Sequence, residues 1–414
     1  MSSHSKCRSC ERPLVTLFLD LGLSPLSNAF LLESQLSEAE VFYPLQVYVC
    51  DACFLVQLGE VVALEKLFNN QYAYFSSYST SWLEHAREFA INSVKRLHLN
   101  AASRVVEIAS NDGYLLQYFK ELGIPVLGVE PSANTAQVSL KKGIPTRIEF
   151  FGLSLAKAMA DSDERADLIV ANNVVAHVPD LHDFLAGFKM LLKPTGTVVW
   201  EFPHFLKLFE QRQFDTIYAE HVSYFSLSSF EQALKKHDLV TVDVEQLSTH
   251  GGSLRVYARH AGQQYVNVDA QARLKKVRED EARARLNRLE TYKTFASQVA
   301  SLRDETWQFF AAARKQEKRV AGYGAPAKGN TFLNFAGIRS DSLPFTVDRS
   351  VAKQGKFLPG SRIPVFSTDY LIAQKPDYIF ILAWNLEKEI THDLQIARSW
   401  GAKFVTAIPS LRIL

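Results

Sequence analysis

The chain has 414 residues, of which 47% are hydrophobic and 22% charged, and its formal net charge is +2. This length predicts more than one domain, and the composition is that of a folded protein with apolar cores. The near-neutral charge gives no argument for a nucleic-acid partner, and no apolar run is long enough to cross a membrane. The first residues, MSSHSKCRSCE, lack the apolar stretch of a secretory signal, so we expect a cytoplasmic protein.

Residues 1–70 are predicted to form a small zinc-binding module. The cysteines form two C-x2-C pairs, Cys7 with Cys10 and Cys50 with Cys53, and no cysteine follows them. Each such pair presents two thiolates from one turn, which is typical of zinc sites, and disulfides are not expected in a reducing cytosol. Four buried free thiols are the alternative, which the paired spacing disfavours. Because four thiolates close the coordination shell, we expect the Zn²⁺ to be structural.

Residues 71–260 are predicted to form a doubly wound α/β domain. An amphipathic helix over 81–97 leads into it, and apolar strands then alternate with helices. In chain order the segments are strand RVVEIAS, helix YLLQYFKELG, strand VLGVEP, helix ANTAQVSLKKG, strand DLIVANN, helix DLHDFLAGFKMLL, and strands GTVVWEFP and SLRVYARH. Parallel strands joined by helical crossovers are typical of such a sheet.

Two further regions follow. Residues 261–318 contain a long charged stretch with apolar positions at mostly helical spacing, which predicts one or two helices that connect two domains. A coiled coil is the competing interpretation, but the heptad pattern is too broken for it. From RVAGYGA onward the strand–helix alternation restarts, so residues 319–414 are predicted to form a second, smaller α/β domain.

The loop EIASNDG, from Glu107 to Gly113, predicts a cofactor without phosphates. A dinucleotide fold has G-x-G-x-x-G there, and that pattern is missing. S-adenosylmethionine has a zwitterionic end suited to Asp112 and ribose hydroxyls suited to Glu130, which lies at about the 20-residue spacing of a ribose-binding acid. The residues expected to bind it are Glu107, Ser110, Asn111, Asp112, Gly113, Glu130, Pro131, Asn172 and Asn173. An NAD-type sheet with a degenerate loop is the alternative.

The order of these motifs resembles that of the sugar C-methyltransferases, which act at C3 of nucleotide-linked 4-keto-deoxyhexoses in branched-sugar biosynthesis. The blocks that carry the resemblance are the two C-x2-C pairs, SSYSTSWLEH, EIASNDGYLL, GVEPS, ANNVVAHVPD, YAEHVSYFS, HGGSLRVY, YGAPAKGNTFLN, KQGKFLPG and ILAWNL. Ala109 departs from the family, which often has a glycine there. The resemblance implies a zinc module, a class I S-adenosylmethionine-dependent methyltransferase core and a C-terminal Rossmann-like α/β domain that helps to hold the sugar nucleotide.

The resemblance also implies that His221 removes the proton beside the ketone, with Tyr218, Glu220, His177 and Tyr72 around it, before the enolate attacks the sulfonium methyl group. A neutral imidazole with a pKa near its ordinary value of about 6.5 suits this task, a Tyr hydroxyl or second imidazole can stabilise the enolate oxygen, and Glu220 can orient either group. For His221 the alternative is a core histidine satisfied by a carbonyl group. The histidines expected to be surface or packing residues are His85, His98, His182, His237, His260 and His392.

In the second α/β domain, GYGAPAKGN lies between a strand and a helix. Gly324, Gly329 and the helix N-terminus are typical of an anion site, with Lys328 as the cation, and a diphosphate is the expected ligand. A plain turn with an exposed lysine is an equal alternative. The residues expected to contact the substrate are Tyr224, Lys328, Asn330 and Lys353.

Two other functions stay open at this point. An O- or N-methyltransferase of a small metabolite would not need a base that generates a carbanion. A zinc-containing binding module without activity is disfavoured by the intact cofactor acid and the intact YAEH block. The expected partner is a nucleotide-diphosphate keto-sugar, with neither nucleic acid nor membrane, and a monomer is compatible with the sequence.

Overall fold

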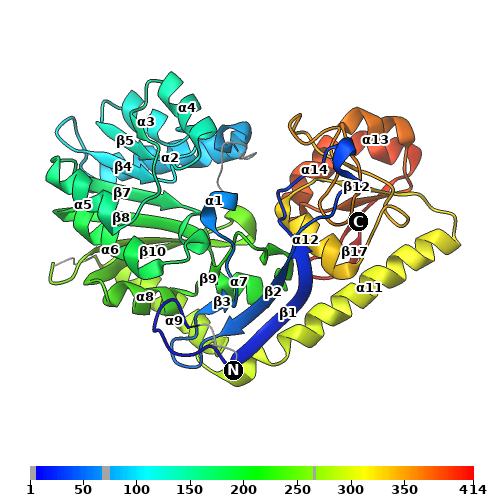
Figure 1. The fold of residues 1–414 in the computed structure, drawn as a ribbon, viewed down its shortest axis with the longest axis horizontal. Coiled ribbons are helices and arrows are strands. Elements are labelled where there is room, and N and C mark those ends of the chain that lie inside the picture. Colours follow the sequence, from blue (N-terminus) through cyan, green and yellow to red (C-terminus); the bar gives the residue numbers. More distant parts are fainter. Residues whose placement is uncertain (1–5, 68–74, 264–266) are drawn as a thin grey trace.

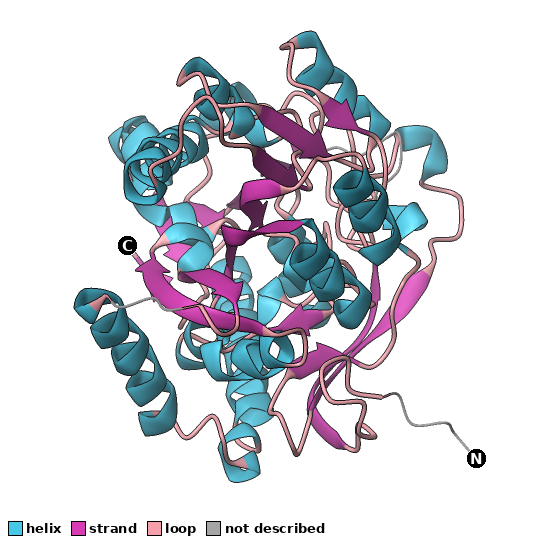
Figure 2. Ribbon diagram, turned by 90° about the vertical axis from the view of Figure 1, so that its left-hand side faces the viewer, coloured by secondary structure: helices cyan, strands magenta, loops and turns pink. Residues whose placement is uncertain are grey.

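Two lobes and a base that joins them make up the molecule (Figure 1). The computed structural model describes residues 6–67, 75–263 and 267–414, so Tyr72 lies outside the described residues. The base is formed by β1 (Thr16–Pro25) and α11 (Phe295–Lys315). Strands run through the interior of the molecule with helices around them (Figure 2). None of the helices in these ranges combines the length and apolar content that a membrane crossing requires.

The first lobe contains a seven-stranded sheet. In spatial order its strands are β10 (Leu239–Leu247), β11 (Ser253–His260), β8 (Leu192–Pro203), β7 (Ala166–Asn172), β4 (Val105–Ile108), β5 (Val126–Val129) and β6 (Thr146–Arg147). The strands from β8 to β6 are parallel, which confirms the predicted doubly wound sheet. The β10–β11 pair departs from the expected parallel alternation, because the chain turns back over residues 248–252 with only a three-residue 3-10 helix (Thr249–Gly251), and strands joined by so short a connection pair antiparallel.

Helices cover this sheet. They are α2 (Thr80–Leu97), α3 (Leu116–Glu121), α4 (Ala133–Lys141), α5 (Leu153–Asp161), α6 (Leu181–Leu191) and α8 (Leu227–Lys235), whereas α7 (Phe205–Glu210) packs with β1 and α11. The first of them begins because the Ser79 side chain accepts a hydrogen bond from Trp82 N, and it ends at His98, which has a left-handed φ of 53°. The segment just before this helix contacts the cofactor loop, as described below.

The N-terminal module builds a four-stranded sheet that includes a strand of the first lobe. The order is β1, β2 (Phe42–Val49), β3 (Val56–Leu58) and β9 (Ser223–Tyr224), and α1 (Leu64–Leu67) follows β3 in the chain. Each strand is antiparallel to its neighbour. Since β9 begins two residues after His221, the sheet of the zinc module reaches the candidate catalytic loop.

The second lobe contains a six-stranded sheet with a Rossmann-like order. The strands are β14 (Val365–Phe366), β13 (Thr346–Val347), β12 (Val320–Tyr323), β15 (Tyr378–Ile381), β16 (Lys403–Thr406) and β17 (Arg412–Ile413), and the helices are α12 (Ala327–Ala336), α13 (Thr368–Gln374) and α14 (Glu387–Asp393). All pairs except β16–β17 are parallel. The strand order reverses beside β12, and open sheets bind ligands at the carboxyl ends of the strands at such a point.

The connector gives one helix to each lobe. Helix α9 (Val268–Arg283) packs on β10 and α8, whereas α11, which follows α10 (Leu289–Tyr292), packs on β1 and α12. A single apolar cluster continues through β1, α7, α11 and α12. Within it the Phe18 ring lies 4.9 Å from that of Phe295 and 5.8 Å from that of Phe205. The N-terminal module and both lobes therefore share one core.

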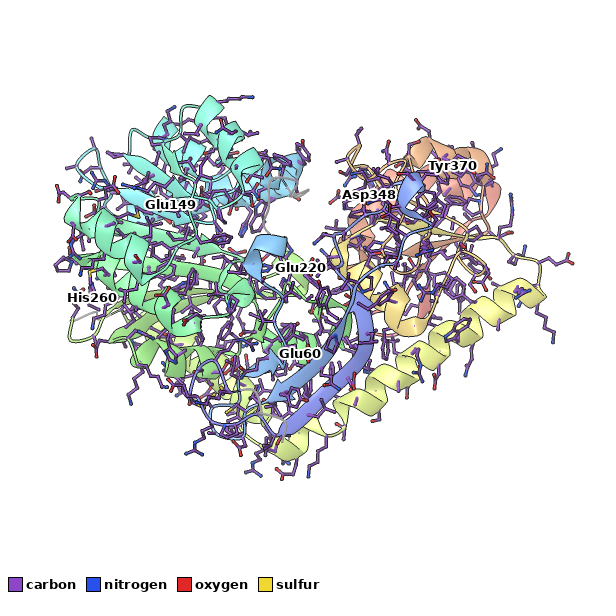
Figure 3. The ribbon with its side chains drawn as sticks, in the orientation of Figure 1. Glu60, Glu149, Glu220, His260, Asp348 and Tyr370 are labelled. Carbon is purple, nitrogen blue, oxygen red and sulfur yellow. The ribbon has the colours of Figure 1, made fainter. Side chains whose placement is uncertain are left out.

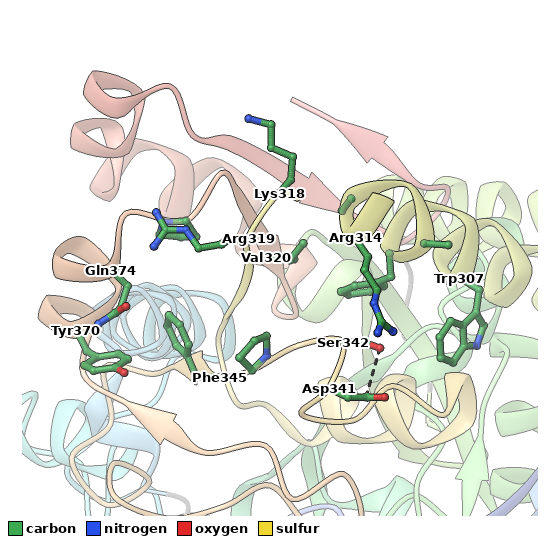
Figure 4. Close-up of a pocket in the computed structure, with 15 residues that line it drawn as sticks. Trp307, Arg314, Lys318, Arg319, Val320, Asp341, Ser342, Phe345, Tyr370 and Gln374 are labelled. Carbon is green, nitrogen blue, oxygen red and sulfur yellow. Dashed lines mark hydrogen bonds between the residues drawn. The ribbon is translucent and has the colours of Figure 1, made fainter. Parts of the chain in front are cut away.

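A cavity of about 580 Å³ opens beside the second lobe (Figure 4). Its lining includes Trp307 and Arg314 of α11, Phe345, and Tyr370 of α13. The cavity lies at the amino ends of β12, β13 and β15, because residues just before each of these strands line it. It is therefore at the opposite end of the sheet from the switch point, and none of the predicted site residues lines it.

Candidate active site

The loop between β4 and α3 forms the predicted cofactor site. Ala109, Asn111 and Gly113 have positive φ values of 57°, 50° and 75°. Glu130, directly after β5, accepts hydrogen bonds from Asn111 N at 2.9 Å and from Ser132 N at 2.8 Å. The carboxylate thus fixes the loop against the neighbouring strand, while each oxygen keeps a second lone pair that can accept from a ligand.

Buried acceptors without a hydrogen-bond partner among the described residues gather at this edge of the sheet. They are Oδ1 of Asp112 and the side-chain carbonyl oxygens of Asn172 and Asn173, and the buried carboxylate of Glu107 lies beside them with Tyr114 as its neighbour. Burial raises the pKa of Glu107 well above its ordinary value. Because an unpaired buried acceptor is costly, such a group points to a ligand that brings donors. The ammonium group and ribose hydroxyls of S-adenosylmethionine are such donors, so these residues fit that cofactor.

The segment that precedes α2 lies over the cofactor loop. Ser76 N donates to Asn111 Oδ1 at 2.9 Å, and Ser77 N donates to Asp112 Oδ2 at 3.2 Å. Lys142 Nζ joins the two segments, because it donates to Ser77 Oγ and to Asp112 O at 2.9 and 2.8 Å. The SSYSTSW motif therefore serves to cover and hold the loop.

A charged cluster at the end of β8 was not predicted. Buried Glu201 accepts from Arg255 Nη2 at 2.8 Å and from Thr249 Oγ1 at 3.0 Å, and His85 Nε2 lies 2.9 Å from it. Burial alone would raise the pKa of Glu201, but His85 and Arg255 more than offset it, and the pKa is lowered. The Trp82 ring stacks on His85, with centroids 4.9 Å apart. His85 is thus more than a packing residue, and the carboxylate inside the apolar strand VVWEFP was the signal for this cluster.

Two hydrogen bonds fix the tautomer of His221. Its Nδ1 donates to Thr216 O at 2.9 Å, so in the neutral ring Nε2 carries no proton. The Tyr218 hydroxyl lies 2.9 Å from Nε2 and donates to it. Tyr224 was expected to contact substrate, but it is 6% exposed and its hydroxyl donates to His221 O at 2.8 Å. Tyr224 therefore supports the loop that carries the candidate base.

His177 and Glu220 lie next to His221. The ring centroids of His177 and His221 are 4.7 Å apart, and His177 Nδ1 donates to Glu220 O at 2.7 Å. The Glu220 carboxylate accepts from Asn28 Nδ2 at 3.2 Å. The expectation that this carboxylate orients the base is therefore corrected, because Thr216 O holds His221. Glu220 instead ties the N-terminal module to the catalytic loop.

Burial keeps the imidazoles of this site neutral. Burial, with the neighbouring His177 as the next cause, lowers the pKa of His221 well below its ordinary value. Burial also lowers the pKa values of His177 and His250 to about 4. The pKa of the Glu220 carboxyl is raised by burial to about 6. At neutral pH, His221 Nε2 can therefore accept a proton.

His250 belongs to the same group, although no role was predicted for it. Asn173 Nδ2 lies 3.3 Å from His250 Nε2. His250 has a φ of 54° and Gly251 one of 91°, and a Cβ at Gly251 would lie 2.5 Å from the Trp384 ring. The HGG motif is thus the place where the backbone of the first lobe approaches the second lobe too closely for a side chain.

The second lobe brings a cation to this interface. Lys328 Nζ donates to Asn385 Oδ1 at 2.7 Å and lies 4.4 Å from the centre of the Trp384 ring. Trp384 Nε1 donates across the interface to Asp215 Oδ2 at 2.7 Å. Burial lowers the pKa of Lys328 to about 8 and raises that of Asp215 to about 6. Asp215, Trp384 and Asn385 were missed because their partners are distant in the sequence.

Asn330 and Lys353 hold the loop after β12. Asn330 Nδ2 donates to Ser27 O at 2.6 Å, and its Oδ1 is buried without a hydrogen-bond partner among the described residues. Lys353 Nζ donates to Ala325 O at 3.0 Å and lies 3.4 Å from Asp348 Oδ2. Both side chains keep the capacity for a further hydrogen bond.

The four cysteines form the predicted metal site. Their Sγ atoms lie within 4.8 Å of one another, with Cys7–Cys53 at 3.4 Å and Cys10–Cys50 at 3.3 Å. Zinc bonds of about 2.3 Å place tetrahedral thiolates roughly 3.8 Å apart, so the set fits Zn²⁺. Gln57 Nε2 donates to Cys7 Sγ at 3.2 Å, which supports the ligand from outside the metal shell. The described ranges contain no second cluster of this kind.

Three family models match the chain in order. A zinc binding domain matches residues 7–68, a methyltransferase domain matches 82–244, and a C-methyltransferase C-terminal domain matches 248–409. The last model begins in the turn before β11, so it includes one strand of the first lobe and the connector as well as the second lobe.

Relatives of the chain include methyltransferases of two kinds. C-methyltransferase NovU of Streptomyces niveus is 33% identical over 409 residues, covering 99% of this chain and 96% of that protein. A ubiquinone biosynthesis O-methyltransferase of Rhodopseudomonas palustris strain BisA53 is 33% identical over 106 residues, covering 25% of this chain and 42% of that protein. An S-adenosylmethionine-dependent methyltransferase structure from Clostridium acetobutylicum ATCC 824 has a TM-score of 0.36 at 14% identity, covering 44% of this chain and 92% of that one. The full-length similarity and the ordered family models show that this chain belongs to the C-methyltransferase family, with S-adenosylmethionine as its cofactor and an N-terminal zinc site.

Proposed function

We propose that the protein deprotonates C3 of a nucleotide-linked 4-keto-6-deoxyhexose and methylates the resulting enolate. The observation that supports this most is the pair formed by His221 Nε2 and the Tyr218 hydroxyl, 2.9 Å apart, in a ring whose other nitrogen is held by Thr216 O. Methylation at carbon requires a base that breaks a C–H bond, and a neutral, oriented imidazole is such a base. The Lys328 ammonium at the same interface is the proposed cation for the substrate diphosphate.

In the proposed reaction His221 Nε2 takes the proton from C3. The Nδ1–H bond to Thr216 O keeps the ring in place as the imidazolium forms. The Tyr218 hydroxyl, displaced from Nε2 by the substrate, donates to the enolate oxygen. S-adenosylmethionine supplies the electrophilic methyl group. The cofactor loop and the segment over it hold that group and exclude water from the enolate.

Exchange of the C3 hydrogen in heavy water tests the proposal. Purified protein, a nucleotide-linked 4-keto-6-deoxyhexose and S-adenosylhomocysteine, which cannot donate a methyl group, are incubated in D₂O. Deuterium should enter at C3, because enolate formation requires only the base and the oxyanion donor. His221→Asn should lower both exchange and methylation by about 10²–10⁴-fold, the usual contribution of a general base.

The matched control is His98→Asn. His98 is exposed at the far end of α2, about 27 Å along that helix from its first turn, and Asn tolerates its left-handed φ. This variant should match the wild type. A folded His221→Asn protein that binds S-adenosylhomocysteine and methylates at a near-normal rate would refute the assignment and make His177 the next candidate. Methylation of an oxygen or nitrogen acceptor without any C3 exchange would favour O- or N-methylation of a small metabolite.

A further inference from the structure

The His250 ring has one nitrogen that is fixed and one that is open. Asn173 Nδ2 lies 3.3 Å from His250 Nε2, and an amide nitrogen can only donate, so Nε2 is the acceptor. In the neutral ring the proton therefore lies on Nδ1. No hydrogen bond from Nδ1 is found among the described residues. The half-buried His250 thus presents an N–H donor that is open to a ligand.

The turn that carries His250 is held from several sides. His250 and Gly251 have positive φ values of 54° and 91°, and side chains other than glycine adopt this conformation only uncommonly. Thr249 Oγ1 donates to the buried Glu201 carboxylate at 3.0 Å, which anchors the turn to the end of β8. The Trp82 ring packs on the His250 ring, with centroids 5.3 Å apart. Because its backbone, one ring face and Nε2 are all held, the imidazole has little freedom to turn.

His250 lies near both the candidate base and the cation of the second lobe. After burial and His177, His250 is the next side chain among the causes that lower the pKa of His221. After burial, Lys328 is the next cause of the lowered pKa of His250 itself. The loop that carries His221 reaches the space between the lobes, where Figure 3 labels Glu220. A substrate held by Lys328 and deprotonated by His221 would therefore pass beside His250.

The proposed reaction requires hydrogen-bond donors at the enolate oxygen. Proton removal from C3 places negative charge on the oxygen at C4, and enzymes stabilise such an oxyanion with donors that are already in position. His177 cannot be one of them in its neutral form, because its ring proton lies on Nδ1 and is donated to Glu220 O at 2.7 Å. A neutral imidazole with an open N–H can polarise a carbonyl group and stabilise its enolate.

We infer that His250 is a catalytic residue, which donates from Nδ1–H to the enolate oxygen beside the Tyr218 hydroxyl, and that Asn173 sets its tautomer. This inference rests on the proposed function, because the enolate is that of the proposed reaction. No proton leaves His250, and its hydrogen bond strengthens while His221 takes the proton from C3. The alternative is that His250 only packs the HGG turn against Trp82.

Two variants of His250 separate these roles. His250→Asn tolerates the left-handed φ and keeps an amide N–H close to the position of Nδ1, so it should stay clearly more active than His250→Ala. His250→Ala has no donor, and it should lower both C3 exchange and the kcat of methylation about 10²–10³-fold, the usual effect of removing one oxyanion donor. KM should change much less, because the hydrogen bond strengthens only as charge develops.

His98→Ala is the matched control for backbone strain. His98 is exposed and has a φ of 53°, so alanine there meets the same left-handed conformation at the far end of α2. This variant should unfold at a lower temperature and keep both rates. Unfolding temperature and S-adenosylhomocysteine affinity are measured for every variant, and both should remain close to wild type in the two His250 variants that are compared.

The tautomer is tested without any change to the active site. Nitrogen NMR of the full chain with labelled histidines should show the His250 ring neutral at neutral pH, with its proton on Nδ1. The signal is assigned by its loss in His250→Asn. A proton on Nε2 would overturn the inference, because Nδ1 could then not donate.

Two kinetic results would also overturn the inference. They are a folded His250→Ala protein that exchanges and methylates at near-normal rates, and an equal loss of rate in both His250 variants, which a packing role would give. Failure of the proposed function looks different, since the wild-type protein would then neither exchange nor methylate C3 of a 4-keto-6-deoxyhexose nucleotide, and the role of His250 would fall with it.

Discussion

At His221, the direction of two hydrogen bonds decides which nitrogen can accept a proton. A carbonyl oxygen can only accept, so Thr216 O forces the Nδ1–H tautomer, and Nε2 faces the Tyr218 hydroxyl. Burial and the neighbouring His177 then lower the pKa of the ring, so that it carries no proton at neutral pH. The cost of this arrangement is basicity, because an imidazole with a lowered pKa is a weaker base than one in water.

The pH dependence of kcat/KM follows from this burial. A base must be unprotonated, so activity is lost as pH falls through its pKa, and a lowered pKa moves that loss to lower pH. We therefore expect the acid-side fall in kcat/KM to have an apparent pKa clearly below about 6.5, the unperturbed pKa of histidine. The measurement is kcat/KM between pH 4.5 and 8, with circular dichroism at each pH to confirm folding.

Glu220 supplies the control for this profile. Burial raises the pKa of its carboxyl to about 6, so Glu220 could produce a limb of its own. In the Glu220→Gln protein, the acid-side fall in kcat/KM that the base causes should persist with the same low apparent pKa. A limb with an apparent pKa of 6.5 or above in both proteins would mean that a buried imidazole is not the base.

Among elements, the pairing of β3 with β9 connects the zinc site to the catalytic loop. Val56 and Gln57 of β3 lie opposite Tyr224 and Ser223 of β9. Arg8, between the first two cysteines, donates through Nη1 to Leu58 O at 2.8 Å and to Val222 O at 3.2 Å. The zinc site can therefore influence the reaction rate, because Arg8, which lies between two of its cysteines, donates a hydrogen bond to Val222, the residue after His221.

We expect zinc removal to lower kcat more than it lowers cofactor affinity. A Cys10→Ser protein should lose zinc by elemental analysis, unfold at lower temperature and show a reduced kcat. Arg8→Met is the sharper variant, since it should keep its zinc and its S-adenosylhomocysteine affinity and still lose kcat. A folded, zinc-free protein with the kcat of the wild type would show that the two sites are independent.

The elements also show which features of the fold and the site could be predicted from local sequence pattern. The alternation of apolar strands and helices, the paired cysteines and Glu130 were predictable because each depends on residues close in the chain. The β3–β9 pairing, the contact of Trp384 with Asp215, and the bond from Asn28 to Glu220 were not, because nothing in one segment encodes its distant partner. The role of Tyr224 in holding the His221 loop was not predictable for the same reason, since only the fold shows that its hydroxyl donates to a main-chain oxygen.

On the scale of the whole molecule, both lobes contribute to the reaction site that we propose. The first lobe holds the cofactor loop and the imidazoles, and the second adds Lys328 and Trp384. The Trp384 indole links the two lobes directly, because its Nε1–H donates to Asp215. Substrate binding should therefore depend on this contact more than cofactor binding does.

Trp384→Phe tests that dependence. The change keeps a ring over Lys328 and beside Gly251 but removes the donor to Asp215, so KM for the substrate should rise about 10- to 100-fold, the effect of losing a hydrogen bond to a charged group. Affinity for S-adenosylhomocysteine should stay the same. Trp307→Phe is the matched control, because that indole donates to Ala336 O at 2.7 Å away from the interface. Equal changes in the two variants would contradict the assignment.

The apolar cluster shared by β1 and α11 has a consequence for the newly made chain. Phe18 packs on Phe295, so the apolar face of the first strand lacks the native cover that α11 provides until most of the protein has been synthesised. At about 5–20 residues per second on the ribosome, that interval is roughly 15 to 55 seconds. During this time the nascent strand is a target for chaperones and for aggregation, and a chain that stops before α11 would keep that face exposed.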